Sequence, residues 1–175
     1  MADFNLNDFG SFRYYGRIGK FETSIAYSKL IGSFDLLVSV DYISNENIKN
    51  GSFEHTPVFT KMVKDNIFND DYDYDMCNDI TKLCGVFEIL SERGGLSEDE
   101  KNLKNGIAEK IFFSKNDTLD REDVNKLYKK AKKYISKEEL AEKKKQGEEL
   151  GKKEAINERN VIKEKMQKME IDFTK

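Results

Sequence analysis

The sequence predicts an α+β fold in which helices dominate, with a small N-terminal β element, a helical body and a long, charged C-terminal helix. A single proline interrupts the 175 residues, so long helices are permitted almost everywhere. Apolar residues recur at spacings of three and four through residues 76–90, which indicates a helix, and alternate with polar residues through 34–42, which indicates a strand. An all-α fold is the alternative, because part of the N-terminal region also fits a helical face.

The composition predicts one globular domain, residues 1–135, followed by a charged helical extension, residues 136–175. A chain of this length can bury enough apolar surface for one core. Hydrophobic residues make up 38% of the chain and charged residues 36%. The sequence has no apolar run long enough to cross a bilayer, and its N-terminus lacks the basic region of a signal peptide. We therefore expect a cytoplasmic protein with no membrane partner.

Charge is divided by position along the chain. Residues 1–125 contain 14 basic and 23 acidic side chains, whereas residues 126–175 contain 16 basic and 10 acidic ones. The formal net charge of -3 conceals this division. Like charges gathered on one surface accelerate the encounter with an oppositely charged partner, so the pattern favours a protein that binds another molecule.

The first fifty residues carry two competing patterns. Residues 34–42 alternate like a half-buried strand, but several of the same residues fit a helical face. We expect a strand over about 11–21, a helix over about 22–32 that ends near Gly32, and a strand over about 34–42. Thr56 followed by Pro57 is typical of a helix start and predicts a helix of about twelve residues from there. The competing helical face consists of Tyr27, Leu30, Ile31, Phe34, Leu37 and Val38.

Local capping signals predict the helices that follow residues 76–90. Ser97 and Glu100 have the spacing of a capping box, and Asp120 can cap the next helix. A second capping box, Ser136 with Glu139, predicts a break near 136 and a new helix over about 137–170.

The last of these helices is polar on nearly all sides. Gly147 and Gly151 weaken it, so we expect it to fray or bend between them unless a partner holds it. We do not predict a stable coiled coil, because the apolar residues of the helix do not keep a heptad. These residues are Leu150, Ile156, Val161, Ile162, Met166 and Met169.

The two cysteines, Cys77 and Cys84, are expected to be buried thiols in a reducing compartment. Seven residues of helix separate their Cα atoms by about 10 Å along the axis, which is too far for a disulfide. A zinc site would need further ligands, and His55 is the one histidine in the chain. We therefore predict no metal ion and no cofactor.

A dense group of aspartates is the first candidate binding site. Residues 69–75 contain four carboxylates and two tyrosines. A calcium loop would need glycine where Met76 stands and glutamate where Lys82 stands, so the pattern argues against an EF-hand. Closely spaced carboxylates can imitate the phosphates of a nucleic acid; the structural alternative is an exposed loop whose Asp75 caps the next helix. The candidate residues are Asp65, Asp70, Asp71, Asp73, Asp75 and Asp79.

A basic, aromatic segment near the N-terminus is the second candidate. Cations that hold phosphates and rings that stack on bases are what a single-stranded nucleic-acid groove uses. The structural alternative is an edge strand whose charged outer face discourages aggregation. The candidate residues are Arg13, Tyr14, Tyr15, Arg17 and Lys20.

A run of lysines is the third candidate. On a helix these side chains share one side, where they could meet phosphates or an acidic protein. Lysine without arginine or aromatic neighbours indicates weak, salt-sensitive contact, and a solvated helix face is the structural alternative. The residues are Lys126, Lys129, Lys130, Lys133 and Lys137.

The sequence does not favour catalysis. His55 has Glu54 beside it, but adjacent side chains on an extended segment point apart. The motifs of serine hydrolases, zinc proteases and cysteine proteases do not occur. We therefore predict a non-enzymatic protein.

Three kinds of binding protein remain. The first is a regulatory factor, such as a phage or mobile-element accessory protein, that inhibits or modulates a host nuclease or defence complex through its acidic surface as a nucleic-acid mimic. The second is a nucleic-acid-binding accessory protein that uses the N-terminal basic segment and the lysine run. The third is an assembly component that oligomerises through the C-terminal helix. The sequence gives no partner identity or oligomeric state.

Overall fold

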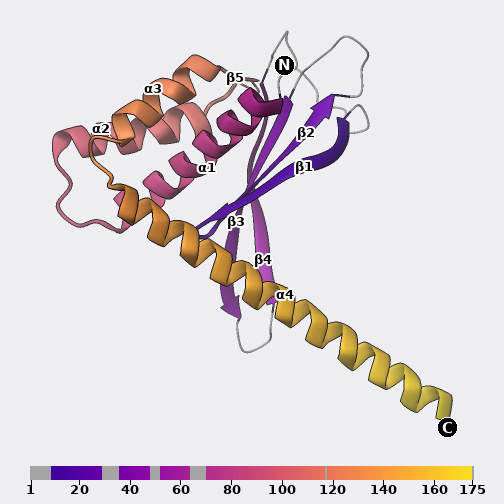
Figure 1. Ribbon diagram of the computed structural model, residues 1–175. Coiled ribbons are helices and arrows are strands. Elements are labelled where there is room, and N and C mark those ends of the chain that lie inside the picture. The colour runs from indigo at the N-terminus through magenta and orange to yellow at the C-terminus, as the bar shows by residue number, and fades with distance from the viewer. Residues whose placement is uncertain (1–8, 29–35, 48–51, 64–69, 117, 175) are drawn as a thin grey trace.

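The computed structural model describes residues 9–28, 36–47, 52–63, 70–116 and 118–174 (Figure 1). Four strands come first: β1 (Phe9–Ile18), β2 (Phe21–Ser28), β3 (Leu36–Asn47) and β4 (Ser52–Val63). They are followed by α1 (Asp70–Glu92), α2 (Glu98–Ile107), the π-helical turn η3 (Ala108–Phe112), the short strand β5 (Thr118–Leu119), α3 (Arg121–Ala131) and α4 (Lys137–Thr174).

The architecture is a curled, five-stranded mixed sheet with helices. The strand order is β1-β2-β3-β4-β5; the first four strands pair antiparallel, and β5 pairs parallel to β4. The prediction of a helical body with only a small N-terminal β element is therefore wrong, and so is the all-α alternative. Strands fill most of the described chain before residue 64, and the helices begin after it.

Strand β2 replaces the helix predicted over residues 22–32. Phe21, Thr23 and Ile25 are buried, while Glu22 and Ser24 between them are half-buried, which is the period of two that a strand requires. The helical spacing that competed with this pattern depended mainly on residues 29–35, which lie outside the described ranges.

Strand β4 replaces the helix predicted from Pro57. Proline cannot donate a hydrogen bond to a sheet, so it is tolerated at edges and bulges. The pairing of β3 with β4 shifts register between Val40 and Asp41, where Asp41 lies opposite Pro57, so the proline sits at an irregularity. Phe59 and Lys61 then turn inward at alternate positions.

Helix α1 forms the centre of the core. It packs on β1 and β2, and α2 and α3 pack on it in turn (Figure 1). Its apolar stripe is buried as predicted, with Ile80, Leu83 and Leu90 fully inaccessible. Cys77 and Cys84 are confirmed as free, buried thiols. Burial raises the pKa of Cys77 to about 12, although hydrogen bonds with Thr23 and Thr81 act in the opposite direction.

The capping signals are confirmed. Ser97 and Glu100 make both bonds of a capping box at the start of α2, and Asp120 accepts a hydrogen bond from the Glu122 N–H at the start of α3. Ser136 and Glu139 make the second capping box, so α4 begins where the sequence predicts.

Helix α4 is continuous through both glycines, contrary to the expected fraying. A Cβ atom at Gly147 would stand 3.0 Å from the Ile18 Cα and from the Arg17 carbonyl carbon. The glycine therefore allows the helix to approach the backbone of β1, and this contact holds the helix in place. In the described part of the chain, α4 and the other helices lack the length or the apolar run needed to cross a bilayer.

Candidate functional site

The sheet and α4 together build a charged cluster that the sequence does not predict. Arg17, Glu22, Asp41 and His55 come from β1, β2, β3 and β4, and Glu154 comes from α4. The strand register explains the assembly, because Arg17 lies opposite Glu22 and Glu22 lies opposite Asp41. Five elements of the fold therefore meet at one point.

Glu154 is the residue through which the helix joins this charged cluster. Its carboxylate makes a 2.5 Å hydrogen bond with His55 Nε2 and accepts another from Arg17. The same Arg17 nitrogen lies 2.8 Å from Glu22 Oε2, and His55 Nδ1 lies 3.6 Å from Glu22 and 3.8 Å from Asp41. Burial raises the pKa of Glu154, but the hydrogen bonds from His55 and Arg17 more than offset this effect, so the pKa lies below its ordinary value.

The charged cluster has the donor atoms of a metal site, but its positive charge disfavours a bound cation. One ligand atom each from Glu22, His55 and Glu154 lie within 4.8 Å of one another. Both carboxylates, however, already pair with the Arg17 guanidinium, and a dication placed between them would be repelled by it. The arrangement therefore acts as an ionic tether that holds α4 on the sheet.

Replacement of Glu154 by glutamine is expected to remove part of the acid sensitivity of the fold. The folded-state pKa of Glu154 is depressed, so its contribution is complete above the ordinary value of 4.5 and is lost as the pH falls through the folded-state value. The free energy of unfolding, measured by denaturant titration from pH 7 to pH 3, should fall less steeply in the variant. Glu100 and Glu139, whose pKa values are also lowered, are present in both proteins and cancel in the comparison. Parallel pH profiles would contradict the assignment.

A second tether lies closer to the start of α4. Lys143 is buried, and its Nζ atom lies 2.9 Å from Glu88 Oε1 and 2.8 Å from Glu92 Oε2, both on α1. Burial lowers the pKa of Lys143, but the hydrogen bonds to Glu92 and Glu88 raise it by more than burial lowers it. The pKa of Lys143 therefore lies above its ordinary value. The Glu88 carboxylate also accepts the Lys20 backbone N–H, which joins the β1–β2 turn to both helices.

The predicted acidic surface is only partly described. Asp65 lies outside the described ranges, and Asp70, Asp71 and Asp73 lie in the first turn of α1, where side chains are not described. The two remaining aspartates, Asp75 and Asp79, share a groove between α1 and α3 with three lysines. The lysines are Lys82, Lys129 and Lys132.

The electrostatics of that groove are mixed. Burial raises the pKa of Asp79, with Lys82 and Lys132 acting in the opposite direction. Lys82 and Lys132 also stand over the Tyr128 ring, at 5.4 and 4.6 Å from its centroid. Asp79 therefore interacts with neighbouring cations of the same protein, and Asp75 lines the same groove. The acidic surface as a whole stays a prediction.

The predicted basic residues are divided by the fold. Arg17 is engaged in the charged cluster, whereas Lys20 is exposed in the β1–β2 turn. Arg13, Tyr14 and Tyr15 lie in β1, and their side chains are not described. The lysine run is exposed, with three residues on α3, one in the turn after α3 and one at the start of α4. These are Lys126, Lys129, Lys130, Lys133 and Lys137.

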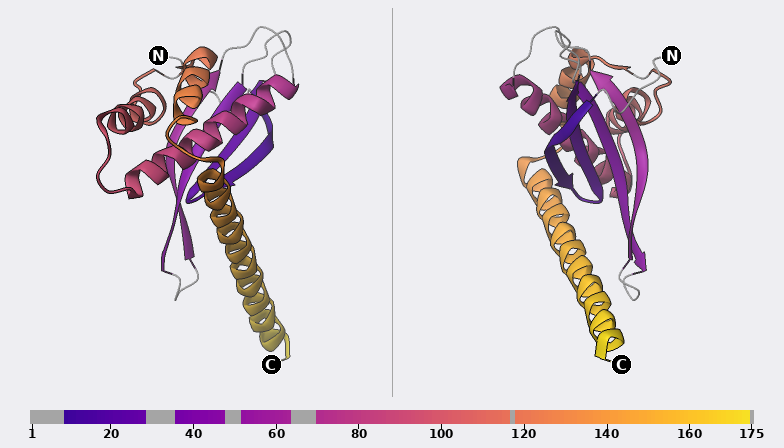
Figure 2. Two further views of the ribbon diagram at one scale, coloured as in Figure 1. Left: turned by 60° about the vertical axis from the view of Figure 1, so that its left-hand side comes forward. Right: turned by 90° about the vertical axis from the view of Figure 1, so that its right-hand side faces the viewer.

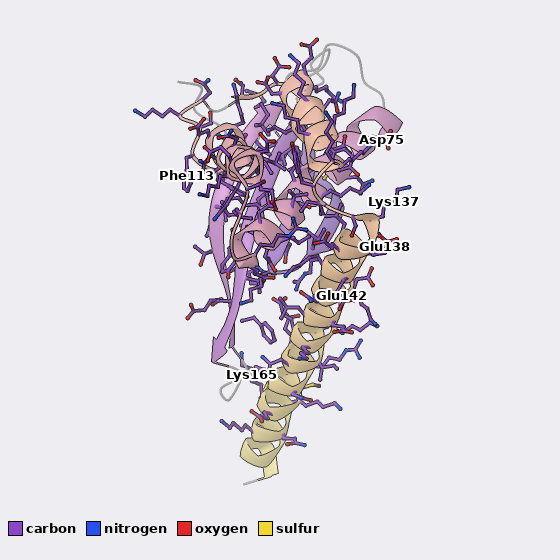
Figure 3. The ribbon with its side chains drawn as sticks, turned by 90° about the vertical axis from the view of Figure 1, so that its left-hand side faces the viewer. Asp75, Phe113, Lys137, Glu138, Glu142 and Lys165 are labelled. Atoms are coloured by element: carbon purple, nitrogen blue, oxygen red, sulfur yellow. The ribbon has the colours of Figure 1, made fainter. Side chains whose placement is uncertain are left out.

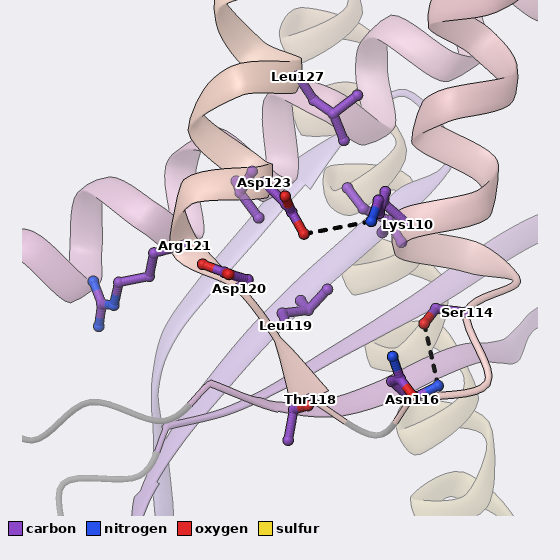
Figure 4. A pocket seen from close by; sticks show the side chains of 11 residues that line it. Lys110, Ser114, Asn116, Thr118, Leu119, Asp120, Arg121, Asp123 and Leu127 are labelled. Carbon is purple, nitrogen blue, oxygen red and sulfur yellow. Dashed lines mark hydrogen bonds and ion pairs between the residues drawn. The ribbon is translucent and has the colours of Figure 1, made fainter.

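A cavity of about 630 Å³ lies between η3, β5 and the start of α3 (Figure 4). Lys61 fixes one wall, because its buried Nζ donates hydrogen bonds to the Ser114 and Asn116 carbonyls at 3.1 and 2.6 Å. Of the charged groups in the lining, Lys110 lies 3.6 Å from Asp123, and Asp120 caps α3. These groups serve the local structure and do not converge on a ligand position.

The C-terminal half of α4 stands away from the body (Figures 1 and 2). Every described side chain from residue 155 to 169 is exposed except that of Asn157, which is half-buried. Figure 3 shows Lys165 on this half, with Glu138 and Glu142 on the packed half and Phe113 elsewhere, after η3. Large apolar side chains are among the exposed ones: Ile156, Val161, Ile162, Met166 and Met169.

The sequence contains one signal for the charged cluster, the alternation of polar and apolar residues in its strands. A helical interpretation of the same segments hides this signal. Glu22 and Asp41 are polar positions in alternating segments, and His55 precedes Pro57 by two residues. If residues 21–28 and 52–63 are treated as strands, these side chains fall into one row. Their meeting with Glu154, 99 residues beyond His55, depends on the path of α4.

Comparison of the chain with protein families, with curated proteins and with solved structures finds no match.

Proposed function

We propose that this chain is a non-catalytic protein-binding factor that engages its partner through residues 155–174 of α4. The observation that carries the proposal is the set of large apolar side chains exposed on a helix whose first half is fixed to the body. Most helical stability in proteins comes from the packing of an apolar face, so exposed apolar groups on a helix gain stability when a partner covers them.

The state of the histidine supports the non-catalytic part of the proposal. Both ring nitrogens of His55 face carboxylates, and two of these carboxylates pair with Arg17. A histidine held in this way is suited to fixing α4. The two buried thiols favour a reducing compartment, so we place the protein in the cytoplasm.

The test compares two charge insertions at adjacent positions of α4. Ile162→Glu and Val161→Glu introduce the same side chain at exposed positions, about 100° apart around the helix. Proteins bound by the wild-type chain in a lysate of the source cells should be lost with one variant and retained with the other, because a docking helix uses one face. Equal retention by both variants, with unchanged circular dichroism spectra, would refute the use of α4.

A second candidate function is nucleic-acid binding through α3. The observation in its favour is that Lys126, Lys129 and Lys130 are exposed on α3, and that Lys133 is exposed in the turn that follows it. Binding to a labelled oligonucleotide should then weaken steeply as salt rises, and replacing these lysines with glutamine should reduce the salt dependence. An oligonucleotide affinity that is insensitive to those replacements would exclude the lysine run.

A further inference from the structure

The exposed half of α4 carries an apolar stripe at heptad spacing. Ile162, Met166, Met169 and Phe173 are separated by four, three and four residues, which is the a/d pattern of a coiled coil. Ile156 and Val161 lie off this stripe, which is why the apolar residues of α4 taken together show no heptad. The pattern appears when only the part of the helix beyond the body is considered.

The described side chains of the apolar stripe are open to solvent. Ile162, Met166 and Met169 have exposed fractions of 56%, 59% and 59%. Single exposed apolar residues are ordinary on a protein surface, but a contiguous row on one helix face marks an interaction site.

The apolar stripe also points in a direction that a second molecule can reach. At about 100° of rotation per residue, the stripe is centred roughly 90° around the helix from the face that Lys143, Gly147 and Glu154 turn to the body. A neighbour could therefore lie along it without displacing α4 from β1 or α1.

The charges that flank the apolar stripe indicate which molecule fits. Lys163 and the position of Glu170 flank it on one side, and Glu158, Lys165 and the position of Asp172 flank it on the other. Each flank carries both signs, so a surface that complements this one has the same composition. That is a property of a self-associating helix.

Two alignments of identical helices bring opposite charges together. In a parallel, in-register pair, Glu158 lies opposite Lys163 of the second copy, and Lys165 lies opposite Glu170. In an antiparallel pair with Met166 opposite Met169, Lys163 lies opposite Glu170 and Lys165 opposite Asp172. Both alignments stack four apolar layers and pair these flanking charges with opposite ones. The parallel alignment also places Arg159, one heptad before Met166, opposite Arg159 of the second copy, whereas the antiparallel alignment does not.

We propose that the partner of the apolar stripe is a second copy of this chain, and that residues 158–173 form a short two-helix coiled coil. The proposal rests on the proposed function, because it names the occupant of the same half of α4. Four apolar layers are few, so the dimer is reversible and dissociates on dilution.

The experiment is analytical ultracentrifugation of the full-length chain over a wide concentration range. The wild-type mass should rise from 20.3 kDa towards twice that value. Ile162→Glu, which places a charge in an apolar layer, should raise the dimer dissociation constant at least about tenfold, whereas the matched Val161→Glu should leave it within about twofold. Lys163→Glu should also weaken the dimer, and Lys168→Glu, the same change on the outer face, should not.

The outcomes separate the two proposals. A chain that stays monomeric up to millimolar concentration overturns the self-association, and so does a dimer that Ile162→Glu and Val161→Glu weaken equally. If the chain is monomeric yet still loses a captured protein on Ile162→Glu, the docking role of α4 stands and only the identity of the partner is wrong. If dimerisation does not depend on Ile162, and capture depends on neither Ile162 nor Val161, both proposals fail.

Discussion

Replacement of Lys143 by methionine is expected to lower the free energy of unfolding by about 2–3 kcal/mol, less than the full cost of breaking a deeply buried ion pair because one acidic partner is exposed. The side chains of Lys143 and Glu88 are 9% and 11% exposed, whereas that of Glu92 is 60% exposed. Methionine preserves most of the packing volume but leaves the Glu88 carboxylate in a poorly hydrated position without its cation. The loss should appear in urea titration at pH 7.

The neighbouring residue provides the control. Lys144 is exposed one position further along α4, and Lys144→Met should change the free energy of unfolding by no more than about 0.5 kcal/mol. If Glu88→Gln is added to Lys143→Met, part of the lost stability should return, because the unpaired charge is removed. Equal effects of Lys143→Met and Lys144→Met would show that the buried ion pair contributes no stability.

Replacement of Gly147 by leucine is expected to lower the free energy of unfolding by about 1–3 kcal/mol, the usual cost of inserting atoms into a filled space. The atoms that a new Cβ would meet at 3.0 Å belong to the backbone of β1, which cannot rotate away as a side chain can. Either α4 or the strand must therefore shift, and both tethers lie on the same helix. The stability lost through this displacement should exceed the stability that leucine adds through its higher helix propensity than glycine.

Gly151 is the matched control on the same helix. A Cβ atom there meets the Arg17 side chain at 3.5 Å or more, an ordinary contact distance. Gly151→Ala should therefore stabilise the protein by about 0.5–1 kcal/mol through helix propensity, while Gly147→Ala should not. Thermal unfolding of the two alanine variants and the leucine variant would test the pair. A Gly147→Ala variant that is more stable than the wild type would indicate that the backbone of β1 shifts to accommodate the new Cβ atom.

Local signals predicted the part of the fold that local interactions form. The capping boxes at Ser97 and Ser136 and the Asp120 cap involve residues within three positions of each other, so the sequence contains the complete interaction. The buried stripe of α1 has the same character, because it repeats at helical spacing within one segment.

Strands β2 and β4 could not be predicted in the same way. Their residues fit a helical period as well as a strand period, and the choice is made by partners elsewhere in the chain. In the sheet, Glu22 lies opposite Arg17 of β1 and opposite Asp41 of β3. Pro57 is accommodated by a register shift opposite Asp41. The charged cluster depends on that choice and also on the path of α4, so it becomes visible only when the strands and the helix are placed together.

The two tethers fix where α4 points. Lys143 and Glu154 are eleven residues apart, or roughly 16 Å along the helix axis. Two separated contacts fix the direction of the helix axis, whereas a single contact would let the helix rotate about that point. A molecule that docks on the far end of α4 is consequently held at a defined angle to the sheet, and a force applied there would act first on β1 and β4, whose Arg17 and His55 bind Glu154.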